Sequence, residues 1–369
     1  SVGINLTSFN NSNISDNYIR NMTKNGIEIK IHAYNDTFYN NTFEEIGNIA
    51  ITASNVHSGN QFLDNTFVDI TQQSIRLYNL TTGNIVANNN LSTSSGDIVV
   101  IFTNNTNITN NTLLGSSINI TNATNSSILD NSIDNGAIID NGDSEDSLYV
   151  DNSVAGSGGI SIISINSNRA NVTDNFVSNG GTYGIYINGS SCIIKSNDLM
   201  SYIYLYGASD SNITANNLSI DSGYAIRLKA GAHTNNISLH NISRTSYIAI
   251  ESGMNNSIEN NNFTGGAIQL FVNQGPNWIH NNMFTNQSGL NLSQTSFVNI
   301  TYNNFTPSSA SPSVILDGAS NGTIANNFFY EGRIVLLTTT GGTISANNTL
   351  INNTMNTSGP ANAKILFSN

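Results

Sequence analysis

The sequence predicts an all-β parallel solenoid of about 16 stacked rungs, each of roughly 22 residues and each holding two or three short strands. A short pattern recurs along the whole chain: an apolar residue at position zero, an Asn at plus three and a second apolar residue at plus five. Each copy follows a pair of apolar residues separated by one residue, and no helical periodicity competes with this alternation.

The asparagine column is the most regular feature of the sequence. Position zero of successive copies is occupied by Ile14, Phe38, Phe62, Val86, Ile108, Ile128, Tyr149, Val172, Ile194, Ile213, Ile237, Ile258, Ile279, Ile300, Ile324 and Ser345. The plus-three positions, 19 to 24 residues apart, are occupied by Asn17, Asn41, Asn65, Asn89, Asn111, Asn131, Asn152, Asn175, Asn197, Asn216, His240, Asn261, Asn282, Asn303, Asn327 and Asn348. Stacked rungs would align these side chains into an internal ladder.

The first strand of each rung is predicted from pairs such as Ile27/Ile29 and Ile226/Leu228, whose alternation is typical of a strand with one buried face. Positions zero, plus three and plus five then point inward, and the positions between them point outward. A buried amide without a partner costs about 1 to 3 kcal/mol, so each Asn must bond to the rung above or below. His240 can also donate and accept, which favours a satisfied core histidine over a ligand.

Composition narrows the classes of partner. Charged residues make up 9% of the chain, the net charge is -12, and the 11 Lys and Arg residues are scattered, so nucleic-acid binding is not expected. No run is long and apolar enough for a membrane span. The lone Cys192 excludes an intrachain disulfide, and no cofactor is expected. The acidic stretch from Asp140 to Asp146 is interpreted as a solvated loop, with a weak cation site as the alternative.

The plus-two positions are the nearest approach to a carboxylate site, and in the first half of the chain they read Asp16, Asn40, Asp64, Asn88, Asn110, Asp130, Asp151 and Asp174. These carboxylates alternate with Asn and have no neighbouring column of Lys or Arg. We therefore interpret the column as turn-forming Asx residues and predict that the chain is not an enzyme. A polysaccharide lyase or hydrolase is the less favoured alternative.

Repeats of the form Gly-Ile-x-Ile followed by Asn-x-Ile-x-x-Asn-x-Phe, as around Ile279 to Phe284, resemble right-handed parallel β-helix proteins. The similar patterns are the NosD-type repeats, the pectate-lyase-like architecture and the Asn-rich β-helix repeats of archaeal cell-surface proteins. The resemblance extends over essentially the whole chain and implies the fold. It implies no single function, because that fold is shared by lyases, hydrolases, tailspikes, adhesins and structural proteins.

Asn-x-Ser/Thr sequons occur at outward positions and never at the ladder asparagines, because the residue two beyond each ladder position is the apolar core residue. Extensive N-glycosylation in an extracellular or cell-surface, archaeal setting is the expectation. The candidate sites are Asn13, Asn90, Asn107, Asn171, Asn212, Asn217, Asn236, Asn262, Asn299 and Asn304.

Apolar side chains on the outward side of the first strand suggest contact with another surface. The candidate interface residues are Val99, Ile101, Ile163, Tyr186, Tyr204, Tyr206, Phe271, Ile315, Val335 and Leu337. Lateral packing against another copy of the chain is the preferred interpretation. Glycan binding by stacking is the alternative for Tyr78, Tyr186, Tyr204 and Tyr206, which have Arg76, Arg227 and Lys229 nearby.

The domain prediction is one continuous β-helix over residues 1–369, without evident terminal caps. Open strand edges at both ends would favour head-to-tail contacts. The sequence therefore favours an extracellular structural protein that self-assembles into a filament, sheath or surface layer, with itself as partner. A cell-surface adhesin or glycan-binding β-helix is the alternative function.

Overall fold

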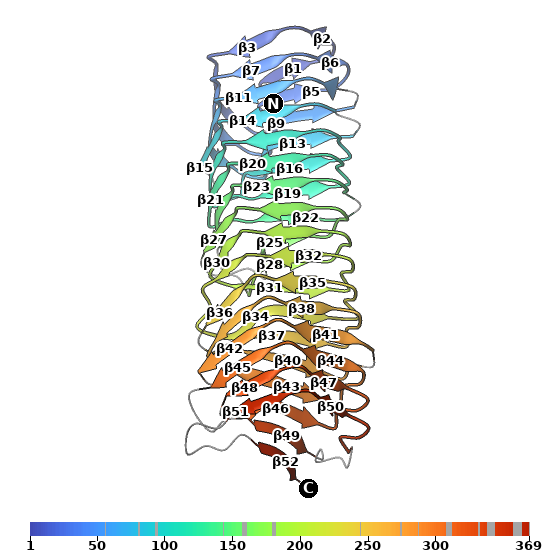
Figure 1. Cartoon of the computed structure of the whole chain (residues 1–369). Coiled ribbons are helices and arrows are strands. Elements are labelled where there is room, and N and C mark those ends of the chain that lie inside the picture. The colour runs from blue at the N-terminus through green and yellow to red at the C-terminus, as the bar shows by residue number, and fades with distance from the viewer. Residues whose placement is uncertain are drawn as a thin grey trace. The chain divides into compact units, whose positions relative to one another are not determined.

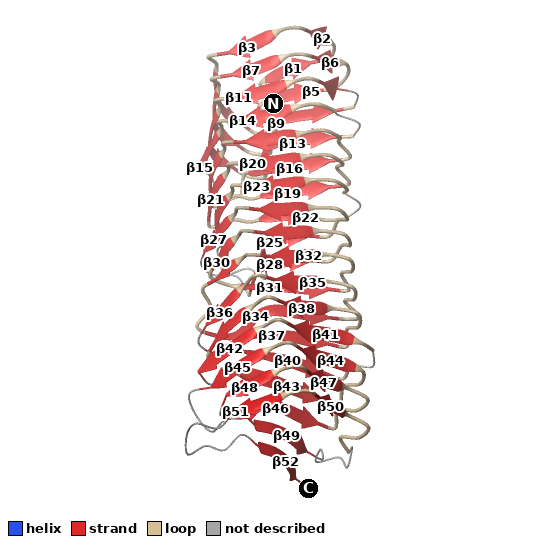
Figure 2. Cartoon of the chain, viewed as in Figure 1, coloured by secondary structure: helices blue, strands red, loops and turns tan. Residues whose placement is uncertain are grey.

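The computed structural model describes residues 1–55, 57–79, 82–92, 95–142, 144–156, 161–178, 182–243, 245–273, 275–286, 288–307, 312–330, 333–337, 344–356 and 364–368. Contacts divide the chain into two compact units, Ser1–Cys192 and Ile193–Asn369, each of which is described by itself. Within these described ranges there are strands and loops but no helix (Figure 2). Each unit is a parallel β-helix, which confirms the predicted fold.

In the first unit successive turns of the coil contribute strands to three parallel sheets (Figure 1). The first sheet contains β1 (Ile4–Leu6), β5 (Ile27–Ile29), β9 (Ile49–Ser54), β13 (Gln73–Tyr78), β16 (Asp97–Ile101), β19 (Ile118–Thr121), β22 (Ile138–Asp140), β25 (Ser161–Ile165) and β28 (Tyr183–Ile187). The second contains β3 (Asn13–Ser15), β7 (Thr37–Tyr39), β11 (Gln61–Leu63), β14 (Ile85–Ala87), β17 (Asn107–Thr109), β20 (Ser127–Leu129), β23 (Leu148–Val150) and β26 (Asn171–Thr173). The third contains β4 (Tyr18–Met22), β8 (Thr42–Ile46), β12 (Thr66–Ile70), β15 (Asn90–Ser92), β18 (Thr112–Leu114), β21 (Ser132–Asp134), β24 (Ser153–Ala155) and β27 (Phe176–Ser178). A small extra sheet is formed by β2 (Phe9–Asn10), β6 (Ala33–Tyr34) and β10 (His57–Ser58).

The second unit repeats the same three-sheet plan. Its first sheet contains β31 (Tyr202–Tyr206), β34 (Ser222–Lys229), β37 (Thr245–Glu251), β40 (Ala267–Phe271), β43 (Gly289–Ser293), β46 (Pro312–Asp317), β49 (Arg333–Leu337) and β52 (Lys364–Ser368). Its second sheet contains β29 (Ile193–Lys195), β32 (Asn212–Thr214), β35 (Asn236–Ser238), β38 (Ser257–Glu259), β41 (Asn277–His280), β44 (Val298–Thr301), β47 (Thr323–Ala325) and β50 (Thr349–Ile351). Its third sheet contains β30 (Asp198–Leu199), β33 (Asn217–Leu218), β36 (Asn241–Ser243), β39 (Asn262–Thr264), β42 (Met283–Asn286), β45 (Asn304–Pro307), β48 (Phe328–Tyr330) and β51 (Thr354–Asn356).

The bend between the second and third sheets is made at position plus two, where the backbone adopts a left-handed conformation. Asp16, Asn88 and Asp174 have φ values of 60°, 56° and 55°. Asn and Asp tolerate this conformation better than other residues with a side chain, because their short polar groups bond locally. The turn-forming interpretation of this column therefore agrees with its backbone, and the same bend recurs at Leu239 and Tyr302 in the second unit.

Apolar residues at positions zero and plus five fill the interior of each unit. In the second unit the rings of Phe263, Phe284, Phe305 and Phe329 stack with centroid separations of 4.7, 4.7 and 4.8 Å. All four side chains are fully buried. The stack repeats at the spacing of parallel strands, so the strand register aligns the rings.

The asparagine ladder is present in both units. From Asn17 to Asn175 each described side-chain amide donates to the amide oxygen of the next rung over 2.9 to 3.1 Å. The same oxygen accepts the backbone N–H of the previous ladder residue, as between Asn41 and Asn65 at 3.0 Å. The amide also donates to a strand carbonyl, such as that of Phe38. This pattern satisfies every polar atom of a buried amide that lies at a bend.

The phase of the final rung differs from the prediction. Leu350 lies opposite Ile324, and Asn353 accepts the side-chain N–H of Asn327 at 3.0 Å. Position zero is therefore Leu350 rather than Ser345, and the ladder position is Asn353 rather than Asn348. Asn348 and Asn353 are five residues apart in the sequence, and the ladder spacing from Asn327 to Asn353 is 26 residues rather than the 21 that the prediction assumed.

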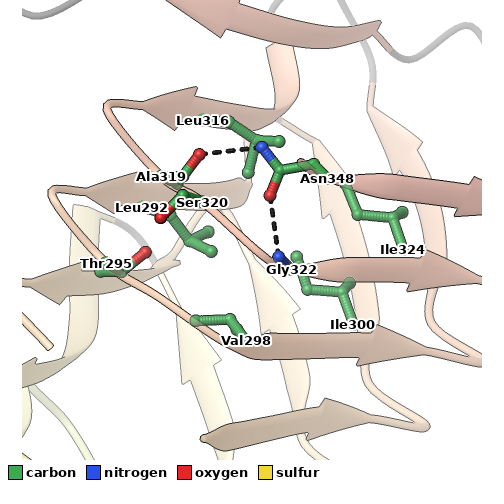
Figure 3. Close-up of a pocket in the computed structure, with 10 residues that line it drawn as sticks. All are labelled: Leu292, Thr295, Val298, Ile300, Leu316, Ala319, Ser320, Gly322, Ile324 and Asn348. Carbon is green, nitrogen blue, oxygen red and sulfur yellow. Dashed lines mark hydrogen bonds between the residues drawn. The ribbon is translucent and has the colours of Figure 1, made fainter. Parts of the chain in front are cut away.

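Asn348 belongs instead to a second column of Asn and Asp side chains, at position minus two, which the sequence-based prediction missed. Its oxygen accepts the backbone N–H of Gly322 at 2.9 Å, and its amide donates to the carbonyl of Ala319 at 2.8 Å; Figure 3 shows both hydrogen bonds. The same column contains Asp36, Asn60 and Asn84 in the first unit and Asn235, Asn256 and Asn277 in the second. Beside Asn348 lies a cavity with room for about one water molecule.

Candidate ligand-binding surface

The most elaborate cluster of outward side chains lies on the first sheet of the second unit. We call it the tyrosine face, and it consists of Tyr202, Tyr204, Tyr206, Tyr224, Arg227, Lys229, Tyr247 and Glu251. These residues lie on β31, β34 and β37, which are neighbours in the sheet. Inward residues such as Ile203 and Leu205 are fully buried, so strand alternation directs the tyrosines between them outward.

Register places the charged groups of the tyrosine face on adjacent strands. Tyr204 lies opposite Arg227, and Tyr206 lies opposite Lys229. Arg227 forms two parallel hydrogen bonds with Glu251, from Nε to Oε1 at 2.8 Å and from Nη2 to Oε2 at 3.0 Å. The Nζ atom of Lys229 lies 3.5 Å from Oε2 of the same carboxylate. Such a two-bond arginine–carboxylate pair fixes the orientation of both groups.

The ion pair between Arg227 and Glu251 is half-buried, and burial and hydrogen bonding together shift the pKa values of both groups. Burial of Glu251 disfavours its charged form, but the hydrogen bond and charge of Arg227 outweigh that effect and lower the pKa of the carboxyl group. The hydrogen bond from Arg227 to Glu251 raises the pKa of the guanidinium above its ordinary value. Both groups are therefore charged at neutral pH, with side chains 19% and 20% exposed.

The tyrosine rings enclose the arginine. The guanidinium carbon of Arg227 lies 4.4 Å from the ring centroid of Tyr224 and 5.4 Å from that of Tyr204, which are cation–π distances. Tyr224 also contacts Tyr202 and Tyr247, with centroid separations of 5.5 and 4.9 Å. Burial raises the pKa of the Tyr224 hydroxyl to about 12, so this group stays protonated and can donate.

The arrangement combines flat aromatic rings with fixed hydrogen-bonding groups on an outer surface. Tyr206 is 43% exposed, whereas Tyr204 is 7% exposed and lies beneath the guanidinium. Aromatic rings offer apolar faces to the C–H surface of a ligand, and their hydroxyl groups bond to its polar edge. Arg227, Lys229 and Glu251 add both donors and acceptors. This chemistry suits a ligand rich in both C–H faces and hydroxyl groups.

The sequence identified part of this surface. It named Tyr204, Tyr206, Arg227 and Lys229 as an alternative glycan-binding group, and the structure brings these four together. It missed Tyr202, Tyr224, Tyr247 and Glu251. The signal for Glu251 was available, because it follows Arg227 by 24 residues, which is one rung, and carries the opposite charge.

The remaining tyrosines and basic residues of that group lie in the first unit. There the guanidinium of Arg76 lies 5.1 Å from the ring centroid of Tyr78, and Tyr186 contacts Tyr183 with a centroid separation of 6.0 Å.

The candidate interface residues do not form one exposed stripe. Val99 is only 7% exposed and Ile163 is fully buried. Ile163 lies in register with the inward residues Ile138 and Ile185, so its predicted outward direction is wrong. Two consecutive isoleucines made the alternation ambiguous there, and a one-residue slip reverses every side chain. Half-buried positions are occupied by Ile101, Tyr186, Phe271, Ile315 and Val335, and the side chain of Leu337 lies outside the described residues.

The acidic stretch in the first unit is not a uniformly solvated loop. Asp140 is fully buried and accepts a hydrogen bond from the Tyr149 hydroxyl at 2.7 Å, and burial raises the pKa of its carboxyl group. Glu145 and Asp146 each lie 2.6 Å from Arg169. Asp143 lies outside the described residues. Among the residues that are described, no group of three or more His, Cys, Asp or Glu side chains could hold a metal ion.

His240 takes the place of Asn in the ladder of the second unit, as expected. Its backbone N–H donates to the Asn261 side-chain oxygen at 3.0 Å, its Nδ1 lies 3.1 Å from the same oxygen, and its Nε2 lies 3.2 Å from the Asn216 amide nitrogen. These partners require a neutral ring that donates from Nδ1 and accepts at Nε2. Burial lowers the pKa of His240 to about 4.

The low pKa of His240 predicts acid-sensitive stability. The unfolded chain binds a proton at this site below about pH 6.5, whereas the folded chain does not until about pH 4. The contribution of neutral His240 to the free energy of unfolding is therefore fully present above pH 6.5 and is lost as the pH falls toward 4. At pH 5 the loss amounts to about 2 kcal/mol. Urea denaturation at pH 7.5 and pH 5 should show a larger loss for the wild-type chain than for His240→Asn. Equal losses in both proteins would contradict the assignment.

The candidate glycosylation sites all lie at exposed or half-buried positions. Exposed positions are occupied by Asn13, Asn90, Asn212, Asn217, Asn262 and Asn304, and half-buried positions by Asn107, Asn171, Asn236 and Asn299. Ladder asparagines such as Asn303 are buried. Over the described ranges, the fold contains no helix with the length and apolar character needed to cross a membrane.

The sequence matches no protein-family model and no curated protein. Among solved structures, the chain is similar to DFA-IIIase from Arthrobacter chlorophenolicus A6 without its lid in complex with GF2, at 14% identity and a TM-score of 0.36, over 65% of this chain and 66% of that chain. It is also similar to the Dettilon tailspike protein gp208, at 12% identity and a TM-score of 0.41, over 79% of this chain and 62% of that chain. The chain thus spans less than two thirds of the length of either structure.

These similarities overturn one expectation. The sequence predicts that the chain is not an enzyme, and this prediction is contradicted because the solved structures similar to it include the enzyme DFA-IIIase. We therefore do not retain it. Similarity at these identities and TM-scores does not indicate which reaction this chain would catalyse or which ligand it would bind.

Proposed function

We propose that this protein binds saccharides on the tyrosine face of its second unit. The observation that carries the proposal is the Arg227–Glu251 pair, which is held in one orientation between tyrosine rings on the outer surface. A half-buried ion pair contributes little net stability to a fold. A fixed donor and acceptor pair beside aromatic rings is, however, typical of sites that bind polar ligands.

The chemistry of a sugar ring suits this arrangement. The C–H faces of a pyranose are apolar and would pack on the accessible ring of Tyr206, while its hydroxyl groups would bond to Arg227, Lys229 and Glu251. Because the polar side chains are already oriented by one another, binding would require little further ordering of these groups.

A glycan array followed by titration tests the proposal. We expect the full chain to bind a defined set of saccharides, and Tyr206→Ala and Arg227→Gln to weaken that binding about tenfold or more, since each removes roughly 1.4 kcal/mol of contact. Tyr302→Ala is the matched control, because Tyr302 is 63% exposed but lies at a second-sheet bend and not on the tyrosine face. Mass spectrometry of the bound saccharide would also detect cleavage.

No binding to any saccharide would refute the proposal. So would equal affinities of the wild-type chain, Tyr206→Ala and Arg227→Gln for the same saccharide. Circular dichroism and the melting temperature of each variant show whether a loss of binding reflects unfolding, and both substitutions alter outward side chains rather than the core.

A self-assembling structural role remains a second hypothesis, favoured by the apolar outward residues Phe271 and Ile315 on the first sheet of the second unit. Negative-stain microscopy of purified protein would reveal a polymer. We also propose an extracellular setting, supported by the outward placement of the sequons. Mass spectrometry of native material should find glycans on Asn262 or Asn304 and none on Asn261 or Asn303.

A further inference from the structure

A second cluster lies on another surface of the second unit, the outward side of its second sheet. We call it the Trp278 cluster, and it consists of Ser257, Glu259, Trp278 and His280. Ser257 and Glu259 lie on β38, directly opposite Trp278 and His280 on β41. Trp278 is the only tryptophan in the sequence, and it is 39% exposed.

The polar members of the Trp278 cluster orient one another. The Nε2 atom of His280 lies 3.1 Å from the Ser257 hydroxyl and 3.1 Å from Oε2 of Glu259. The side-chain amide of Asn281 lies 3.3 Å from Nδ1 of the same ring. The imidazole is therefore held by three partners, and the side chains of His280 and Glu259 are 29% and 26% exposed.

The strands on either side of this cluster present small or uncharged side chains. Asn299 lies in register with Trp278, Ser238 with Glu259, and Thr301 with His280. The indole therefore has no bulky partner in register on either side. Glu259 is the carboxylate of the cluster, and the residues in register with the cluster include no Lys or Arg, so the cluster would disfavour an anionic ligand.

We propose that the Trp278 cluster is a separate binding site for neutral saccharides. The indole supplies an apolar surface for the C–H face of a sugar ring, and the rigidly held carboxylate and imidazole bond to its hydroxyl groups. The site shares no residue with the tyrosine face, which contains Arg227 and Lys229 and so does not select against acidic saccharides. It therefore stands independently of the function proposed above.

The single tryptophan makes this proposal directly measurable. Selective excitation of tryptophan reports only Trp278, and we expect a saturable change in its emission when the full chain is titrated with maltohexaose, cellohexaose or chitohexaose. Glu259→Gln should weaken binding of the saccharide that gives the response about fivefold, as expected when a charged hydrogen-bond acceptor is replaced by a neutral one at a cost of about 1 kcal/mol. Tyr206→Ala should leave the titration unchanged, because Tyr206 belongs to the tyrosine face.

Unchanged emission with all three saccharides up to about 10 mM, the range expected for a binding free energy of only a few kcal/mol, would overturn the proposal. An unaltered affinity in Glu259→Gln would do the same. A titration abolished by Tyr206→Ala would assign the signal to the tyrosine face instead. The full chain could bind no saccharide on the glycan array and still show the saturable change in Trp278 emission. That combination would refute the function proposed for the tyrosine face but not the Trp278 cluster.

Discussion

Replacing Asn303 with Ala is expected to lower the free energy of unfolding of the second unit by about 4 kcal/mol or more. The Asn303 oxygen accepts both the backbone N–H and the side-chain N–H of Asn282, at 2.9 and 3.0 Å. Its amide donates to the carbonyl of Ile279 at 2.8 Å and to the side-chain oxygen of Asn327 at 3.1 Å. Truncation leaves several buried polar groups without partners, each at a cost of about 1 to 3 kcal/mol.

The adjacent residue provides the control. Asn304 has the same side chain but is exposed, so Asn304→Ala should change stability by no more than about 0.5 kcal/mol. Chemical denaturation monitored by circular dichroism compares the two variants. Similar losses of stability in both would contradict the inward hydrogen-bonding role of the ladder.

Replacing Phe284 with Ala is expected to cost about 3 to 5 kcal/mol, because it leaves a ring-sized cavity in a core that cannot collapse around it. The Phe284 ring is fully buried and lies 4.7 Å from the rings of both Phe263 and Phe305. Since each rung contacts mainly its neighbours, the loss should weaken the coupling between the rungs on either side.

Met283 is the matched control for this substitution. It precedes Phe284 on β42 but points outward and is 45% exposed, so Met283→Ala should have little effect on stability. Thermal unfolding of both variants tests the difference. A larger destabilisation from Met283→Ala than from Phe284→Ala would show that the inward and outward assignments are reversed.

Most of the fold could be predicted because its repeating unit is short and chemically distinctive. An Asn held between two apolar residues, as Asn282 lies between Ile279 and Phe284, fits a polar bend inside a stacked core. The prediction failed where local alternation was ambiguous, as at Ile163, and where two asparagines competed for one ladder position, as at Asn348 and Asn353. Register in these places depends on pairing with neighbouring strands, which a single rung does not encode.

The candidate sites were harder to predict because they depend on residues one rung apart. Arg227 and Glu251 are separated by 24 residues and meet only after the strands stack. The Trp278 cluster was hidden for the same reason, since Glu259 and His280 come from different rungs. Once the rung length is known, outward residues of opposite charge at that spacing indicate where such pairs will form.

Hydroxyl-radical footprinting of the full chain with and without a saccharide identified on the array tests the central claim most directly. The account predicts that the saccharide protects exposed Tyr206 and half-buried Tyr202 and Tyr224, while the oxidation of Tyr18 and Tyr302, which are 60% and 63% exposed, is unchanged. Unchanged oxidation of Tyr202, Tyr206 and Tyr224 under saturating saccharide would contradict the assignment of the tyrosine face as the binding surface.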